Sequence, residues 1–376
     1  MNIEKRLKNI SCKEYCNIHN FEYSIQQKEY TQKVYIPDYR DSLEVNNYVY
    51  AKYPETYIAE LYNVNLIGGN SLIFDKNDNC IYDLPLMDDE NRFELRCGNA
   101  LFVDKNVTIV YYDNSTEIIE EGIMLIANAS FNYFHFNLES LSKLCFFDEI
   151  GEYDKVPILV DERCLRIQSF KDELDMLNSH GREIVYLKQG CSYNVKKLVY
   201  LSDLIISPMN FKKDVLIRYD DYIMNEVAVK LLHDKLSINS NITKKLFISR
   251  RNCSLIRLTN QNEIEQIFKE YGYEVIYPEE MSFQDQLKTF SEAEFIAGAS
   301  GAGFTNILFA NKNAKIICIL PKEIKLTCYS NIAGVLGQEC YYLDAKIHYN
   351  TSTVYYQDSF ELEEDYLRKF LEGFKY

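Results

Sequence analysis

Two segments of the sequence determine the architecture of the protein, KKLFISRRNCSLIRLTN (residues 244–260) and EFIAGASGAGFTNILFANKNAKIICILP (residues 294–321). The first begins with an apolar strand that runs directly into two arginines. The second contains a buried strand, a glycine-rich turn, a helix start at Phe304 and an apolar strand that stops at Pro321. Strand, turn, helix and strand in this order form the βαβ unit of a parallel sheet, so the predicted fold class is α/β.

The same segments predict a site for a phosphate-like anion. Glycines let backbone N–H groups approach a ligand closely, and a helix N-terminus adds partial positive charge. Arg250, Arg251 and Arg257 supply guanidinium groups, which hold phosphate bidentately. The alternative is that the glycines serve only tight packing and that the arginines are surface charges. The glycine order GxxGxG differs from the dinucleotide pattern GxGxxG, which argues against an NAD site.

Composition narrows the class of protein. A chain of 376 residues is long for one domain, so two domains are expected. Its hydrophobic fraction of 47% is sufficient for sizeable cores. The net charge of −15 argues against nucleic acid or an anionic membrane as a partner. It also makes the arginine cluster more informative, because acidic residues outnumber basic residues by 56 to 41.

The eleven cysteines indicate a reducing compartment. Their number is odd, several lie in apolar runs, and no apolar signal segment follows Met1, so we expect free thiols in a cytoplasmic protein. Cys12 and Cys16 are the only closely spaced pair, and without a second pair of metal-site spacing no metal is expected. No apolar run approaches eighteen residues, so no transmembrane segment is predicted.

A second informative segment is ASFNYFHFNLESLSKL (residues 129–144). Its apolar residues follow helical spacing. His135 and Glu139 are four residues apart and therefore lie on one side of the predicted helix. A carboxylate one turn away orients an imidazole and stabilises its protonated form, which suits a general base. The alternative is that His135 is a packed histidine with a purely structural role.

The remaining sequence predicts an α/β first half with a β-rich insertion at residues 56–118, and a domain junction near residues 207–210. The predicted domains are residues 1–209 and 210–350, followed by a closing segment, 351–376, whose helix packs back on the first domain. Further helices are expected at residues 22–33, at 214–236 with Asp220 and Asp221 on the solvated face, and at 360–374.

These segments resemble glycosyltransferase family 61 over about residues 60–325. The family pattern joins a strand ending in S-R, a later arginine followed closely by asparagine, an E-Q helix and a G-x-H-G-A-G turn followed by asparagine. NYFHFNLE (residues 132–139) resembles its upstream histidine helix. The residues that match the other parts are Ser249, Arg250 and Arg251, then Arg257 and Asn260, then Asp285 and Gln286, and finally Gly301, Ala302, Gly303 and Asn306.

The resemblance implies a GT-B architecture, with two Rossmann-like domains facing a cleft. Residues 1–209 would form the acceptor side, and residues 210–350 would bind a nucleotide-sugar donor, with UDP as the expected nucleotide. The implied reaction is an inverting, metal-independent transfer of a hexosyl or pentosyl group to a hydroxyl of a glycan or glycolipid. His135 would be the base, oriented by Glu139. The implied donor-binding residues are Ser249, Arg250, Arg251, Arg257, Ser300, Gly301, Ala302, Gly303 and Asn306.

The implied setting is the synthesis of a surface polysaccharide such as a capsule. It would take place in the cytoplasm, and peripheral contact with the inner face of the membrane is compatible with it. No cofactor and no nucleic-acid partner are expected.

Two departures from the family pattern leave alternatives open. The usual histidine of the glycine turn is Ser300 here, and Cys318 stands where members often carry an acidic residue. A serine hydroxyl can hydrogen-bond to phosphate but supplies no charge, and the loss of a carboxylate can remove a ribose contact. One alternative is therefore a non-catalytic protein that binds a nucleotide or a glycan on the same fold. Another is a different phosphate-ester enzyme on an α/β sheet.

Overall fold

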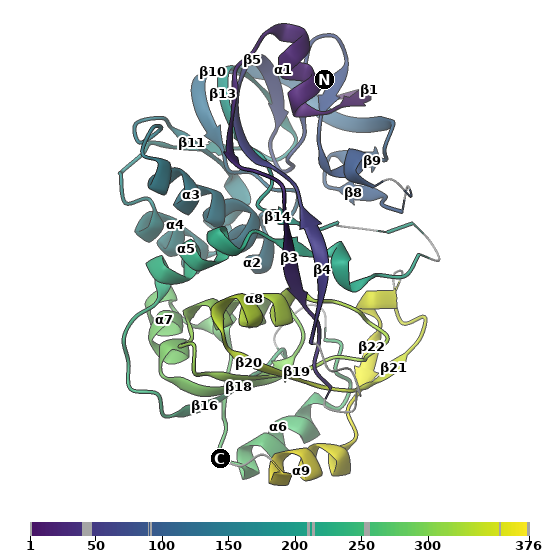
Figure 1. The fold of residues 1–376 in the computed structure, drawn as a ribbon, viewed down its shortest axis with the longest axis vertical. Helices are drawn as coiled ribbons and strands as arrows, with labels where there is room; N and C mark the ends of the chain where they lie inside the picture. Colours follow the sequence, from purple (N-terminus) through teal and green to yellow (C-terminus); the bar gives the residue numbers. More distant parts are fainter. Residues whose placement is uncertain are drawn as a thin grey trace. The chain divides into compact units, whose positions relative to one another are not determined.

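The computed structural model describes residues 2–39, 47–88, 90, 92–208, 211–212, 215–251, 256–352 and 355–373. The chain divides into two compact units (Figure 1). The first comprises residues 1–32, 51–216 and 221–232, and the second comprises residues 33–50, 217–220 and 233–376. Helices and strands are mixed in both, which confirms the predicted α/β class. The junction predicted near residues 207–210 lies partly outside the described residues, and the predicted domain boundaries stay predictions.

The first unit is built on one large sheet. Within the described ranges it holds eleven strands, and its main path is β1-β7-β6-β5-β13-β10-β11-β12. The strands are β1 (Asn2–Ile10), β2 (Tyr23–Gln27), β5 (Thr56–Ile67), β6 (Ile73–Phe74), β7 (Asn79–Ile81), β8 (Leu95–Cys97), β9 (Ala100–Val103), β10 (Val107–Met124), β11 (Ile158–Asp161), β12 (Ile184–Leu187) and β13 (Cys191–Leu201). Because β1 also pairs with β10, the path from β1 to β10 closes into a barrel-like ring.

The two ends of this sheet differ in character. The pairs β5–β6 and β5–β13 are antiparallel, whereas β13, β10, β11 and β12 pair in parallel. Figure 1 shows α3 and α4 beside β11, so the parallel end is the α/β part. The helical segments of this unit are α1 (Cys12–His19), η1 (Leu84–Met87), α2 (Tyr133–His135), the π-helix η2 (Phe136–Leu141), α3 (Ser142–Ile150), η3 (Glu162–Arg166) and α4 (Gln168–Leu177). The predicted α/β half with a β-rich part is confirmed.

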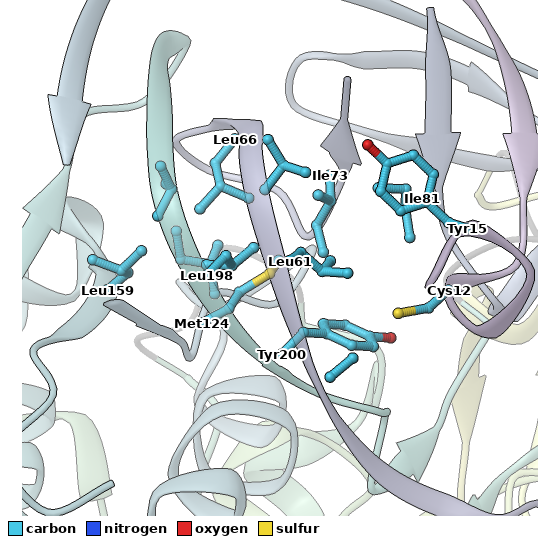
Figure 2. Packing of buried hydrophobic residues seen from close by; sticks show 14 of the residues in the cluster. Cys12, Tyr15, Leu61, Leu66, Ile73, Ile81, Met124, Leu159, Leu198 and Tyr200 are labelled. Carbon is cyan, nitrogen blue, oxygen red and sulfur yellow. The ribbon is translucent and has the colours of Figure 1, made fainter. Parts of the chain in front are cut away.

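One hydrophobic core lies inside the ring and is covered by α1. Figure 2 shows side chains from the helix and from six strands converging there. They are Cys12 and Tyr15 of α1, Leu61 and Leu66 of β5, Ile73 of β6, Ile81 of β7, Met124 of β10, Leu159 of β11, and Leu198 and Tyr200 of β13. Truncating a buried apolar side chain of this kind to alanine lowers the free energy of unfolding by about 2–5 kcal/mol. The core therefore stabilises the closed ring.

Residues 22–33 form strands, and the helix predicted there is wrong. β2 pairs antiparallel with β5, placing Tyr23 opposite Ala59. β3 (Tyr30–Tyr35) pairs with β4 (Tyr48–Tyr53). Tyr23, Ile25 and Tyr30 of this segment are residue types that pack well on a pleated surface, and pairing with β5 and β4 stabilises the strands.

The helix predicted at residues 214–236 is α5 (Glu226–Leu236), which begins much later. Asn225 is its N-cap, because the Asn225 Oδ1 accepts the N–H of Ala228 at 3.1 Å. The residues just before the cap form β15 (Ile223–Met224), which pairs with β14 (Ile205–Ile206). Asp221 is buried and forms an ion pair with Arg92, so its predicted solvated position is wrong. Asp214 lies outside the described residues.

The second unit contains a parallel sheet. Over the described residues it has five strands in the order β17-β16-β18-β19-β20. Every neighbouring pair is parallel. The strands are β16 (Lys244–Ile248), β17 (Glu274–Ile276), β18 (Ala293–Ala299), β19 (Lys315–Ile319) and β20 (Glu339–Leu343). The 3₁₀-helix η6 (Ala302–Phe309) connects β18 to β19, so the βαβ unit predicted from the sequence is confirmed with a tighter helix.

Helices cover both faces of this sheet. In Figure 1, α7 and α8 lie on one face, and α6 and α9 lie on the other. The elements are α6 (Gln261–Glu270), η5 (Pro278–Glu280), α7 (Phe283–Ser291), α8 (Cys328–Leu336), β21 (Lys346–His348), η7 (Tyr355–Gln357), β22 (Ser359–Glu361) and α9 (Glu364–Gly373). Leu367 and Leu371 of α9 are buried in one core with Phe268 of α6. The closing helix therefore packs in the core of the second unit, and the expectation that it packs back on the first domain stays a prediction.

Two further observations concern the whole chain. In the ranges that the structure describes, no helix is long and apolar enough to cross a membrane. The cysteines whose side chains are described are free thiols.

Candidate functional site

The predicted His135–Glu139 pair exists in the first unit. Nδ1 of His135 lies 2.6 Å from Oε1 of Glu139, and the two side chains are 16% and 14% exposed. Asn132 starts the helix, because its side chain accepts the N–H of Phe134 at 3.0 Å. The contact fixes the orientation of the imidazole and leaves Nε2 to exchange a proton with a ligand.

The pair lies where the helix changes from α2 into the π-helix η2. Two side chains explain this change locally. Nδ2 of Asn137 donates to the carbonyl of Tyr133 at 3.1 Å, and Oγ of Ser142 donates to the carbonyl of Leu138 at 2.5 Å. Each bond reaches the carbonyl four residues back, an arrangement that slightly destabilises and bends a helix. Single π-turns of this kind are frequent at functional sites.

A buried carboxyl group supports this turn from α4. Glu173 has no exposed surface, and its Oε2 lies 3.4 Å from Nδ2 of Asn137. Burial raises the pKa of Glu173 well above its usual range, so the neutral form is favoured. Glu173 is not among the site residues predicted from the sequence. Its position on the apolar face of α4, between Phe170 and Leu177, is the signal that identifies it.

The arginines and the glycine turn meet in the second unit. Numbered along the chain, the strands of its sheet follow the order 2-1-3-4-5. In such sheets the ligand binds beyond the carboxyl ends of the first and third strands, where the strand order reverses. These are β16, which leads into Arg250, and β18, which leads into the turn at Gly301. Topology therefore brings the two predicted parts to one edge.

Arg250 lies directly against the turn. A Cβ placed on Gly301 would be 1.5 Å from Nη1 of Arg250, so glycine is required for this approach. Gly298 has a φ of +153°, and a Cβ there would be 2.8 Å from the carbonyl oxygen of Ile248. Ala302 and Gly303 follow in a half-buried position that keeps the turn accessible. The glycines thus permit both the backbone path and the close approach of a cation.

Arg257 approaches the same turn from a buried position. Its Nη1 donates to the carbonyl of Tyr356 at 2.9 Å, and its Nη2 donates to the carbonyl of Ser300. Burial, and then repulsion by Arg250, lower the pKa of Arg257 to about 10. Among the described residues, no carboxylate forms an ion pair with Arg257. Two guanidinium groups therefore bracket the Ser300–Gly301 peptide, and an anion there would relieve their repulsion.

Two other predicted donor-binding residues are held by α6. Arg251 forms an ion pair with Glu265 and donates to the hydroxyl of Tyr277 at 2.8 Å. The hydroxyl of Ser249, which is buried, donates to Oε1 of Glu265 at 2.7 Å. The charge of Arg251 is thus already compensated. Glu265 was missed by the sequence analysis because its partners lie more than a dozen residues away along the chain.

Asn306 is fully buried below the turn. Its Nδ2 donates to Oε1 of Gln286 at 3.2 Å, and Nε2 of Gln286 donates to the carbonyl of Met281 at 3.3 Å. Asn306 therefore ties η6 to α7. Its side chain reaches this support and not an exposed surface, so it positions the turn.

The two departures from the family pattern lie together. Burial raises the pKa of Cys318, while Arg257 and hydrogen bonds from Tyr342 and Ser300 act in the opposite direction. The Ser300 N–H donates to the carbonyl of Ile319 at 3.0 Å. Ser300 and Cys318 therefore form one buried contact, whereas the glycines that follow Ser300 are half-exposed.

The chain thus combines a glycine turn beside two arginines, at the point where a parallel sheet reverses its strand order, with a histidine–carboxylate pair on a separate unit. The family model described as Glycosyltransferase 61 matches residues 133–317. This match supports assignment of the chain to glycosyltransferase family 61. The match contains both the His135–Glu139 pair and the arginine–glycine turn. A comparison with curated proteins finds no match.

Proposed function

We propose that the protein is an inverting, metal-independent glycosyltransferase of the GT-B type, with two Rossmann-like domains facing a cleft. It would move a hexosyl or pentosyl group from a nucleotide-sugar donor, with UDP as the favoured nucleotide, to a hydroxyl of a glycan or glycolipid. UDP, inversion and the GT-B arrangement rest on the family resemblance. So does the proposed setting, surface-polysaccharide synthesis in the cytoplasm or at the inner face of the membrane.

The observation that carries the proposal is the pair of guanidinium groups at the Ser300–Gly301 peptide. Arg257 is buried, it donates to two backbone carbonyls, and a second arginine lies near it. Such an arrangement favours a dianionic ligand such as a diphosphate. The N–H groups of the half-exposed turn from Gly301 to Gly303 add donors to the same place.

The proposed step balances as a direct displacement. His135, oriented by Glu139, takes the proton of the acceptor hydroxyl on Nε2. The acceptor oxygen forms a bond to the anomeric carbon, and the bond from that carbon to the diphosphate oxygen breaks with its electron pair. The negative charge on the leaving diphosphate is stabilised by Arg250 and Arg257. These cations supply the positive charge that a metal ion provides in other transferases, and this supports metal independence.

The test is a titration of the protein with UDP, GDP, CMP and dTDP by calorimetry, with and without Mg²⁺. We expect selective binding of UDP, with the same affinity in EDTA as in Mg²⁺. Binding of none of the four would contradict the proposal. Binding that requires Mg²⁺ would contradict metal independence alone.

A second candidate function is a non-catalytic nucleotide- or glycan-binding protein. The uncharged Ser300–Cys318 contact favours it, because it replaces groups that carry charge in the family pattern. UDP binding without hydrolysis or transfer from any of a panel of UDP-sugars, in the presence of glycan acceptors, would favour this second function.

A further inference from the structure

A partly open cavity of about 220 Å³ lies in the first unit, beside β5 and η1. One part of its wall is apolar and is formed by Leu84, Leu86 and Met87 of η1 together with Ile206. Its volume is below the roughly 300–1,000 Å³ that is usual for drug-sized ligands. The cavity therefore suits a single ring and not an extended chain.

The other part of the wall is polar and built on buried contacts. Asp83 accepts the N–H of Cys12 at 2.9 Å and the hydroxyl of Tyr57. Burial raises the pKa of Asp83, against these two hydrogen bonds. Oδ1 of Asp203 accepts from Nζ of Lys143 at 2.8 Å. Carboxyl oxygens are thus held at fixed positions on the cavity wall.

The charges around the cavity are unequal. Lys13 forms an ion pair with Glu55, and Lys143 forms one with Asp203. In the part of the chain that the structure describes, Asp83 has no ion-pair partner. Both ammonium groups are therefore compensated, and an anionic ligand would meet carboxylates without a cation to pair with it.

The cavity adjoins the surroundings of the histidine pair. A smaller cavity of about 20 Å³, enough for one water molecule, is lined by Glu139. It shares Leu84 and Asp203 with the larger cavity. The polar wall of the larger cavity thus leads, through Asp203, toward the carboxylate that orients His135.

We propose that the larger cavity holds one sugar ring of the acceptor and selects rings that carry no acidic group. This inference rests on the proposed function, because it takes His135 as the base for an acceptor hydroxyl. Sugar hydroxyls donate strong hydrogen bonds to fixed carboxylates, and the C–H face of a ring packs on an apolar wall. A uronic acid would place its carboxylate among like charges, which costs affinity.

The test is a titration by saturation-transfer NMR with two probes, methyl β-D-glucopyranoside and methyl β-D-glucuronide. We expect the neutral glycoside to bind and the glucuronide to bind at least about tenfold more weakly. Leu86→Trp fills the cavity and should abolish the binding of both probes. Met87→Arg adds a cation at the rim, where Met87 is 43% exposed, and should strengthen glucuronide binding. Leu101→Arg is the matched control, since Leu101 is 44% exposed and does not line the cavity.

Equal affinity for the two glycosides, binding of neither, or the same response to Leu101→Arg as to Met87→Arg would overturn the inference. Each sample is also titrated with UDP. UDP binding without glycoside binding would contradict the acceptor role of the cavity and would still agree with the proposed transferase. Glycoside binding without UDP binding would support the cavity and contradict the donor site.

Discussion

The two candidate sites are built in opposite ways. The His135–Glu139 pair comes from one helix and depends on one contact of 2.6 Å. The arginine–glycine turn collects groups from Arg250, Arg257 and the Ser300–Gly303 turn, which the order of the parallel strands brings together. A local site loses its chemistry when one side chain is removed. A site assembled by a sheet loses affinity in steps, because several groups share the ligand.

The largest effect is expected at the local site. His135→Ala should lower the rate of sugar transfer by about 10²–10⁴-fold, because it removes the proposed base for the acceptor hydroxyl. UDP affinity, measured by calorimetry, should stay unchanged. His180→Ala is the matched control, since Nδ1 of His180 also faces a carboxylate, 3.2 Å from Oδ2 of Asp154. Full transfer activity in His135→Ala would contradict the proposed role of His135 as the base.

Single substitutions in the site assembled from several elements should each lower UDP affinity by a smaller amount. Arg250→Ala is expected to reduce UDP affinity by about 10–100-fold, the range for one lost hydrogen bond to a charged group. Arg251→Ala should have a much smaller effect, because Glu265 already compensates that guanidinium. A larger loss of UDP affinity in Arg251→Ala than in Arg250→Ala would reverse this assignment.

The buried Glu173 beside the local site should make the stability of the protein depend on pH. Burial raises the pKa of Glu173 above its ordinary 4.5, so above pH 4.5 the unfolded chain releases a proton that the folded chain keeps. Wild-type stability therefore falls as the pH rises through this window, by up to about 1.4 kcal/mol per pH unit. Glu173→Gln has no carboxyl group here and does not lose this stability. In urea unfolding, the free energy of unfolding of Glu173→Gln relative to the wild type should therefore rise from pH 5 to pH 7.

The exposed Glu149 of α3 provides the control for this measurement. Glu149→Gln should show no growing advantage over the same pH range. A flat difference between Glu173→Gln and the wild type would mean that Glu173 is ionised in the folded protein.

The smallest effect is expected from the turn itself. Gly301→Ala places a Cβ on Nη1 of Arg250 and forces the guanidinium to move. UDP affinity should fall by less than in Arg250→Ala, with little change in melting temperature, because the tip of an arginine is flexible. In Gly303→Ala the nearest atom is Cγ2 of Ile248 at 3.2 Å, so this variant should bind UDP almost normally. An identical loss in both variants would mean that the backbone N–H groups, and not Arg250, determine the affinity.

Features that local patterns determine could be predicted from the sequence. Apolar runs that end at Arg250 and at the glycine turn predicted the βαβ unit, and four-residue spacing predicted the contact of His135 with Glu139. Features that depend on partners far away along the chain could not be predicted. Residues 22–33 became strands because β5 and β4 were available, and the ion pair of Arg251 with Glu265 was not predicted because Glu265 lies on another element. The π-helix depends on side chains competing for carbonyls, which spacing does not reveal.

One feature of the second unit bears on the order in which the protein is made. Arg257 donates to the carbonyl of Tyr356, 99 residues later in the chain, and the N–H of Phe360 donates to the carbonyl of Arg257 at 2.7 Å. During translation the arginines and the turn thus leave the ribosome well before the strand that anchors one of them. A nascent chain would complete its proposed nucleotide site only after β22 has emerged, so binding of a nucleotide would wait until the sheet, the turn and the closing helix can fold together.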